Sequence, residues 1–255
     1  MDKKFSYYNN FYHNPHPVPM QKLLIEFNCS LLNTLLGKLH KKNGESINIL
    51  EIGPGKGYFY EAVKRSKSDI SYSALDSNLL MLESLGISST YLSQLPEVPK
   101  FSKKFDIVYA AFVIEHLKSG KEIYEVISKI KGSINNDGLI VFLFPDCLKQ
   151  KMEFWNMDYT HMYPTTKRNV AMAFYENGIN DINLTEVHGL LMHKFFTNKF
   201  VHALLGVLLF FYNYHFFSKL FWIVYRKPLY DLGNFFYRVY AFFKQENLIL
   251  IAKLK

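Results

Sequence analysis

The sequence predicts an α/β fold with a doubly wound, mostly parallel sheet. Two observations lead to this prediction: short apolar runs alternate with segments of helical periodicity, and the first apolar run leads directly into a glycine-rich turn. Strands that alternate with helices form parallel sheets, whose ligands bind beyond the carboxyl ends of the strands. The length of 255 residues and the apolar share of 49% are sufficient for a packed core of this kind.

Seven strands and five helices are expected from these patterns. The strands cover residues 47–52, 70–76, 88–92, 105–110, 138–145, 182–188 and 248–252. The helices cover residues 20–40, 58–67, 78–85, 119–131 and 165–177. An Asn-Asp-Gly sequence at 136–138 is interpreted as a turn before the fifth strand. The expected architecture is Rossmann-like, a mostly parallel seven-stranded sheet with an antiparallel last strand and a helical insertion before it.

Positive charge is concentrated near the end of the chain. The net charge is +8, and from Leu190 onward nine basic residues stand against two acidic ones. Residues 195–244 mix this charge with many Phe, Leu and Tyr, which favours contact with an anionic membrane surface over a nucleic-acid groove. Alternatively, this segment covers the mouth of the active site, or it is a cap that packs on its own domain or on a second subunit, as in a homodimer.

Cysteine content and the N-terminus bear on the cellular location. Cys29 and Cys147 lack the spacing of a disulfide framework or a zinc site, so no metal site is expected. The first residues lack the apolar stretch of a signal peptide. We therefore expect a cytoplasmic protein, peripheral at the inner face of the membrane if the basic segment binds lipid.

Three alternating glycines follow the first expected strand. The spacing is Glu51-x-Gly53-x-Gly55-x-Gly57, unlike the G-x-G-x-x-G of dinucleotide-binding folds, and this disfavours a nicotinamide dehydrogenase. Glycines let backbone N–H groups approach a ligand closely. A carboxylate at Glu51 would repel a pyrophosphate but suits a ligand that carries an ammonium and a sulfonium.

The glycine run, ILEIGPGKGYF, resembles the first motif of the class I S-adenosylmethionine-dependent methyltransferases. Three further segments resemble later motifs of that family in the same order, namely YSALDSN, FDIVYAAFVIEHL and DGLIVFLFPD. The resemblance covers roughly residues 45–190 and the last strand, and it implies S-adenosylmethionine as the cofactor. On this basis we expect an N-terminal lid and helix, a cofactor-binding core, a basic aromatic helical insertion and the last strand of the core. These parts cover residues 1–45, 46–189, 190–246 and 247–255.

The resemblance also implies which residues hold the cofactor. They are Glu51, Gly53, Pro54, Gly55, Gly57, Asp76, Ser93, Gln94, Ala110 and Ala111. Asp76 would accept hydrogen bonds from both ribose hydroxyls, although an Asp at this junction can instead cap the next helix. Ser93 and Gln94 stand where many family members place an acidic residue against the adenine. Ala110 and Ala111 would lie beside the cofactor.

The acceptor site is expected in the loop after the fifth strand. Its sequence, FWNMDYTHMYPTT, resembles a D-x-T-H loop of methyltransferases that act on sugars and polysaccharide precursors. His161 is the candidate general base, and Asp158 either orients His161 or contacts the substrate. Alternatively, Asp158 and His161 bond each other to brace the loop. His116, at the active-site rim, is a third candidate, with a packing role as the alternative.

The resulting hypothesis is O-methylation of a small-molecule or glycan acceptor, such as a sugar or a lipid-linked glycan intermediate. The alternative is a non-catalytic protein that keeps the fold and acts as a membrane-associated binding module.

Overall fold

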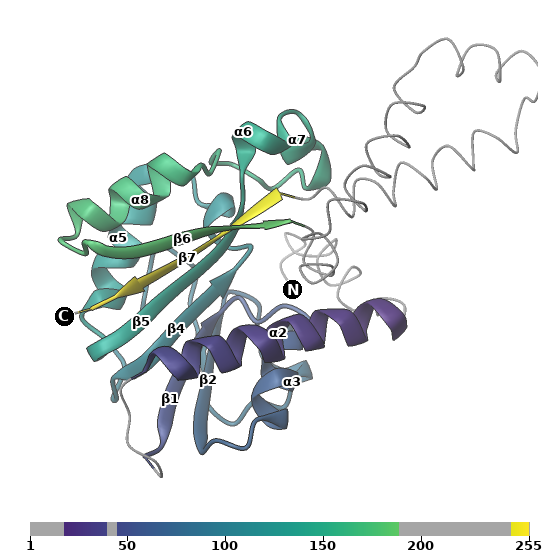
Figure 1. The fold of residues 1–255 in the computed structure, drawn as a ribbon, viewed down its shortest axis with the longest axis vertical. Helices are drawn as coiled ribbons and strands as arrows, with labels where there is room; N and C mark the ends of the chain where they lie inside the picture. Colours follow the sequence, from purple (N-terminus) through teal and green to yellow (C-terminus); the bar gives the residue numbers. More distant parts are fainter. Residues whose placement is uncertain (1–17, 40–44, 189–245, 255) are drawn as a thin grey trace, which may run out of the picture. The chain divides into compact units, whose positions relative to one another are not determined.

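A seven-stranded sheet forms the centre of the fold in a computed structural model of the chain (Figure 1). The structure describes residues 18–39, 45–188 and 246–254. The strand order is β3-β2-β1-β4-β5-β7-β6. The strands are β1 Ile47–Ile52, β2 Ile70–Asp76, β3 Thr90–Leu92, β4 Phe105–Ala111, β5 Ile134–Pro145, β6 Asp181–His188 and β7 Glu246–Lys253. The predicted seven-stranded sheet is thereby confirmed.

The pairing of the strands is mixed, as expected. Strands β1 to β5 pair with their neighbours in parallel. Strand β7 runs antiparallel to β5. This follows from the hydrogen bonds that Leu254, just after the end of β7, exchanges with Asp137 and Gly138 near the start of β5. The N···O distances are 3.1 and 3.0 Å.

Five helices occupy the expected places, and three short ones were not expected. The expected helices are α2 Val18–Lys38, α3 Tyr58–Arg65, α4 Leu79–Ser84, α5 Gly120–Lys131 and α8 Lys167–Glu176. The unexpected ones are η2 Ile114–His116, α6 Cys147–Gln150 and α7 Glu153–Met157. These three follow β4 and β5, so they shape the edge of the sheet where a ligand is expected.

Helices cover both faces of the sheet, as Figure 1 shows. On one face, Phe142 of β5 lies with its ring centroid 5.4 Å from that of Phe174 of α8. On the other face, the Tyr109 ring of β4 lies 4.3 Å from the Phe59 ring of α3, and its hydroxyl is 3.5 Å from Asn28 of α2. Because side chains alternate along a strand, consecutive residues of β4, and likewise of β5, point to opposite faces of the sheet.

The predicted turn at residues 136–138 is wrong, because these residues lie within β5. Asp137 has φ 62°, and the β4–β5 register shifts between Phe105 and Ile107. A Cβ on Gly138 would lie 2.5 Å from a methyl group of Ile134. The turn-forming residues therefore make an irregularity in a long strand instead of a chain reversal.

Several expectations concern residues outside the described part of the chain. The lid before α2, most of the insertion at 190–246 and the proposed membrane surface at 195–244 are among them. By its contacts the chain divides into two units, residues 1–186 with 248–255 and residues 187–247, and the account below concerns the first. None of the described helices has the length and hydropathy that a bilayer span requires.

Asp106 connects the amino ends of three adjacent strands. This residue of β4 is 3% exposed. One carboxylate oxygen accepts a hydrogen bond from the Asn48 N–H of β1, and the other accepts one from the Asn135 amide of β5, both at 2.8 Å. Asp106 therefore holds the end of the sheet opposite to the one where ligands are expected.

Replacement of Asp106 by Ala should destabilise the protein by about 2–3 kcal/mol, because two partly buried donors lose their acceptor. Urea unfolding measures this difference. Asp181→Ala, at the exposed start of β6, is the matched control and should change the free energy of unfolding by less than about 0.5 kcal/mol. Equal effects of the two substitutions would contradict the role given to Asp106.

Candidate active site

The glycine turn connects β1 to α3 with a left-handed backbone. Gly53, Gly55 and Gly57 have φ values of 69°, 51° and 74°, which L side chains rarely adopt. The Gly53 N–H donates to the Leu75 carbonyl of β2 at 2.8 Å. A Cβ on Gly53 would lie 2.6 Å from a methyl group of Val113. The turn therefore needs glycine at Gly53 for its backbone angle and for the close approach of the segment after β4.

Glu51 is a buried carboxylate immediately before this turn. It is 3% exposed, and the Tyr72 hydroxyl of β2 donates a short hydrogen bond to it. The pKa of Glu51 is raised to about 8, mainly by burial; the hydrogen bond from Tyr72 opposes the rise and the charge of Asp76 adds to it. A cationic ligand group beside Glu51 would favour its ionised form.

Asp76 lies at the end of β2, and the cap of the following helix is a different residue. The Asn78 side chain accepts from the Leu80 N–H at 3.1 Å and so caps α4. Asp76 accepts from the Asn78 N–H at 2.8 Å, and burial raises its pKa. Asn78, and not Asp76, therefore caps α4. The expected contact of Asp76 with the ribose stays a prediction.

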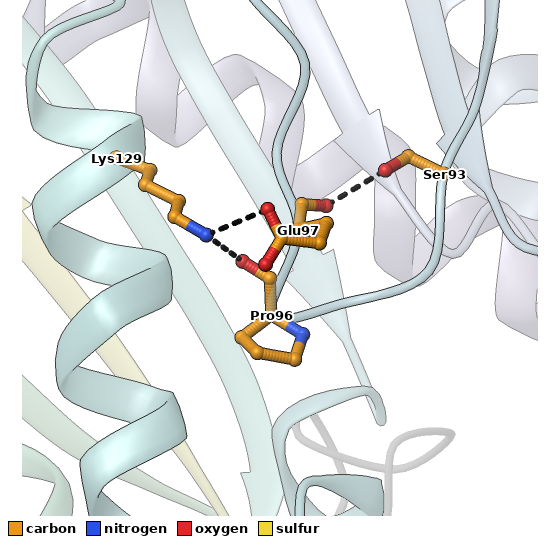
Figure 2. Close-up of polar contacts among 4 residues, drawn as sticks. All are labelled: Ser93, Pro96, Glu97 and Lys129. Atoms are coloured by element: carbon orange, nitrogen blue, oxygen red, sulfur yellow. Dashed lines mark hydrogen bonds and ion pairs between the residues drawn. The ribbon is translucent and has the colours of Figure 1, made fainter.

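The loop after β3 contains Ser93 and Gln94 and is braced from α5, as Figure 2 shows. The Ser93 N–H donates to the Asp76 carbonyl at 3.0 Å, and its hydroxyl donates to the Glu97 carbonyl at 2.8 Å. Lys129 of α5 donates to the Pro96 carbonyl at 2.9 Å and to the Glu97 carboxylate at 3.0 Å. These contacts fix Ser93 beside the end of β2.

The end of β4 brings Ala110 and Ala111 to the same edge of the sheet. Phe112 follows them with φ 56°, a strained angle for an aromatic residue. Its N–H donates to the Leu143 carbonyl of β5 at 2.8 Å. The strained residue redirects the chain into η2, which carries Glu115 and His116.

Glu115, His116 and His161 form a cluster that joins the loops after β4 and β5. One ligand atom from each residue lies within 4.8 Å of those from the other two. Glu115 is 1% exposed, and within the described residues neither of its carboxylate oxygens has a hydrogen-bond partner. Its pKa is raised to about 8, mainly by burial; the nearby N–H of its own backbone opposes the rise, and the charge of Asp158 adds to it.

The His161 ring has one defined tautomer. Its Nδ1 lies 2.5 Å from the Phe154 carbonyl, which can only accept a hydrogen bond. Nδ1 therefore carries the proton, and Nε2 keeps a lone pair. The ring is 8% exposed and lies with its centroid 5.1 Å from that of His116.

Asp158 reaches the cluster through Thr160 and His116. The Thr160 hydroxyl donates to the Asp158 carboxylate at 2.6 Å and lies 3.0 Å from Nδ1 of His116. Because that hydroxyl proton is directed to Asp158, its oxygen accepts from His116. Burial lowers the pKa of His116. The His161 N–H also donates to the Asp158 backbone carbonyl, at 3.2 Å.

The sequence analysis did not select two residues of this cluster. They are Glu115 and Thr160, for which the sequence patterns predict no role. Glu115 stands in the largely apolar run FVIEHL, a context that favours burial of an acidic residue only when it has a partner. The role of Thr160 depends on contacts across 44 residues, which the sequence does not reveal.

Gly53→Ala should destabilise the protein more than Gly86→Ala. Both glycines have a positive φ, but a Cβ on Gly86 meets nothing within 4 Å. Gly86→Ala should cost about 1–2 kcal/mol of backbone strain, and Gly53→Ala a further ~1–3 kcal/mol of overpacking. Urea unfolding measures both, and Val113→Ala combined with Gly53→Ala should recover part of the difference. Equal costs at the two glycines would show that the contact with Val113 is unimportant.

The stability difference between wild type and Glu51→Gln should depend on pH. Glu51 ionises near 4.5 when unfolded and near 8 when folded, so its contribution to stability is full below about 4.5 and is lost as pH rises through 8. Gln keeps an acceptor for Tyr72 but cannot ionise. The variant should therefore gain stability relative to wild type between pH 5 and pH 8, as measured by urea unfolding. A constant difference across this range would mean that Glu51 titrates normally.

Comparison with known proteins identifies the family. A family model described as a methyltransferase domain matches residues 20–184, more than half of the chain. A search of curated proteins by sequence found no match.

Solved structures share the fold at low sequence identity. An S-adenosylmethionine-dependent methyltransferase from Archaeoglobus fulgidus has a TM-score of 0.57 at 17% identity, over 99% of this chain and 100% of that chain. The plantazolicin methyltransferase BpumL, in complex with a pentazolic desmethylplantazolicin analogue and S-adenosylhomocysteine, has a TM-score of 0.59 at 11% identity over 100% and 92%. Phosphoethanolamine N-methyltransferase 2 from Haemonchus contortus, with S-adenosylmethionine, has a TM-score of 0.55 at 15% identity over 89% and 52%. The chain therefore belongs to the methyltransferase domain family and is an S-adenosylmethionine-dependent methyltransferase.

Proposed function

We propose that this methyltransferase acts on a hydroxyl group of a sugar or lipid-linked glycan intermediate, with His161 as the general base. The observation that carries the proposal is the tautomer of His161. The Phe154 carbonyl holds the proton on Nδ1, so Nε2 has the lone pair that a base requires. The sugar class of the acceptor rests on the resemblance of the D-x-T-H loop, Asp158 to His161, to that of sugar methyltransferases.

The residues at the carboxyl edge fit the cofactor. Glu51 offers a buried carboxylate, whose ionised form an ammonium or sulfonium would stabilise, and Asp76 offers an acceptor for ribose hydroxyls. Ser93 and Gln94 lie in the next loop, where they would meet the adenine. When bound, S-adenosylmethionine supplies an electrophilic methyl group on a sulfonium. The residues of the chain must supply the other requirements of methyl transfer.

Those residues orient the acceptor and receive its proton. The acceptor hydroxyl would give its proton to Nε2 of His161, because imidazole is a suitable general base. Burial lowers the pKa of His116, which favours the neutral form of this second imidazole. Thr160 and Asp158 hold the orientation of the His116 ring through their hydrogen bonds. The two imidazoles would thereby line the place where the hydroxyl binds.

His161→Ala should lower turnover by at least ~100-fold while S-adenosylmethionine affinity stays near that of wild type. Formation of S-adenosylhomocysteine with a panel of nucleotide sugars and polyprenyl-linked sugars measures turnover, and calorimetry measures cofactor affinity. His161→Asn is the matched control for packing, because its amide can still donate to Phe154 but has no basic nitrogen. It should be as inactive as His161→Ala.

Two outcomes would contradict the proposal. Unchanged turnover in His161→Ala would remove His161 from the mechanism. Cofactor binding by the wild-type protein without product formation from any acceptor in the panel would favour the non-catalytic binding module. Whether residues 195–244 bring either form to an anionic membrane stays a prediction, which co-sedimentation with anionic liposomes would test.

A further inference from the structure

We propose that Glu115, His116 and His161 bind one divalent transition-metal cation. The sequence predicted no metal site, because the spacing of its two cysteines showed none. The fold nevertheless joins a carboxylate and two imidazoles from segments 45 residues apart, between His116 and His161. The proposal concerns binding of the cation and does not depend on the identity of the acceptor.

The separation of the three groups suits a shared cation. Their ligand atoms lie within 4.8 Å of one another. A point equidistant from three atoms at that limit is about 2.8 Å from each, whereas bonds from first-row metals to nitrogen and oxygen are about 2.0–2.2 Å. Each ligand atom would therefore have to move by less than about 1 Å to reach bonding distance. Small side-chain rotations, without movement of the backbone, would be enough.

Both imidazoles are held as metal-binding histidines usually are. Nδ1 of His161 donates to the Phe154 carbonyl, and Nδ1 of His116 donates to the Thr160 hydroxyl oxygen. In the neutral form of each ring, the lone pair is then on Nε2. In proteins, the second nitrogen of a metal-bound imidazole almost always donates to a carbonyl, a carboxylate or water, which fixes the ring. Asp158 completes this arrangement by accepting from Thr160.

Glu115 supplies an independent indication of a ligand. Its carboxylate is 1% exposed, and within the described part of the chain both oxygens lack a hydrogen-bond partner. Buried charges in proteins are paired or coordinate metals, because an unpaired one is costly. A cation between Glu115 and the two imidazoles would provide the missing partner for both oxygens.

The donor set indicates the class of metal. Two imidazole nitrogens and one carboxylate suit Mn²⁺, Fe²⁺, Co²⁺ or Zn²⁺, whereas Mg²⁺ and Ca²⁺ prefer all-oxygen sites. Three protein ligands leave further positions open, as in catalytic sites. A lone pair that holds a cation cannot accept a proton. In the metal-loaded protein His161 would therefore be a ligand, and its role as a base belongs to the metal-free protein.

The test is a titration of the EDTA-treated protein with Mn²⁺, without cofactor or acceptor. Binding is measured as the decrease in the EPR signal of free Mn²⁺. Wild type should bind one Mn²⁺ that Glu115→Gln binds at least ~10-fold more weakly. Zn²⁺ should displace this Mn²⁺, since zinc binds such donors more tightly. Glu176→Gln, the same substitution at an exposed position of α8, should bind like wild type.

Circular dichroism and thermal unfolding should show that Glu115→Gln is folded, because the amide has nearly the shape of the carboxyl group and carries no charge to bury. His161→Ala should weaken Mn²⁺ binding as well. The proposal is overturned if wild type binds no Mn²⁺, or if Glu115→Gln and wild type bind it equally. Because no turnover is measured, either result leaves the proposed methyl transfer to be judged by its own assay.

Discussion

The parallel register of β1 with its two neighbours is the constraint on which the site depends. Ile52, the last residue of β1, pairs with Leu75 of β2 and with Ala110 of β4. Parallel strands in this register end at one edge, so the glycine turn, Asp76 and the strained Phe112 leave the sheet side by side. An offset of one residue in either pair would turn Glu51 or Tyr109 from one helical layer to the other.

Two of the buried carboxylates at this edge, Glu51 and Glu115, lack a positively charged partner among the described residues. Glu51 and Glu115 each have a pKa raised to about 8, chiefly because burial disfavours the charged form. Glu51 has the Tyr72 hydroxyl as a partner, whereas Glu115 has no hydrogen-bond partner among the described residues. A folded chain keeps such groups at a cost to its stability. Their retention at the ligand edge is explained if a positive group completes each of them, an ammonium or sulfonium at Glu51 and a metal ion at Glu115.

Local patterns in the sequence were sufficient to predict the sheet and the glycine turn. The strands β1, β2 and β4 are short, largely apolar runs, and three alternating glycines need no distant contact to be recognised. The short helices after β4 and β5 have too few residues to show a period. The error at Asn136 to Gly138 has a similar cause, because turn residues and bulge residues are chemically the same and only the neighbouring strand distinguishes them.

The candidate acceptor site was only partly predictable because it depends on side chains that meet across the fold. The edge where the cofactor is expected includes the glycine turn, which local sequence predicts, and the fold around it is shared by solved structures at 11–17% identity. The expected acceptor edge is built from Glu115, His116, Thr160 and His161, and it forms only because the loops after β4 and β5 meet. Two of the solved structures are named for acceptors as different as phosphoethanolamine and plantazolicin, so the shared fold by itself does not define an acceptor. The chemistry particular to this chain must therefore be sought in the loops after β4 and β5.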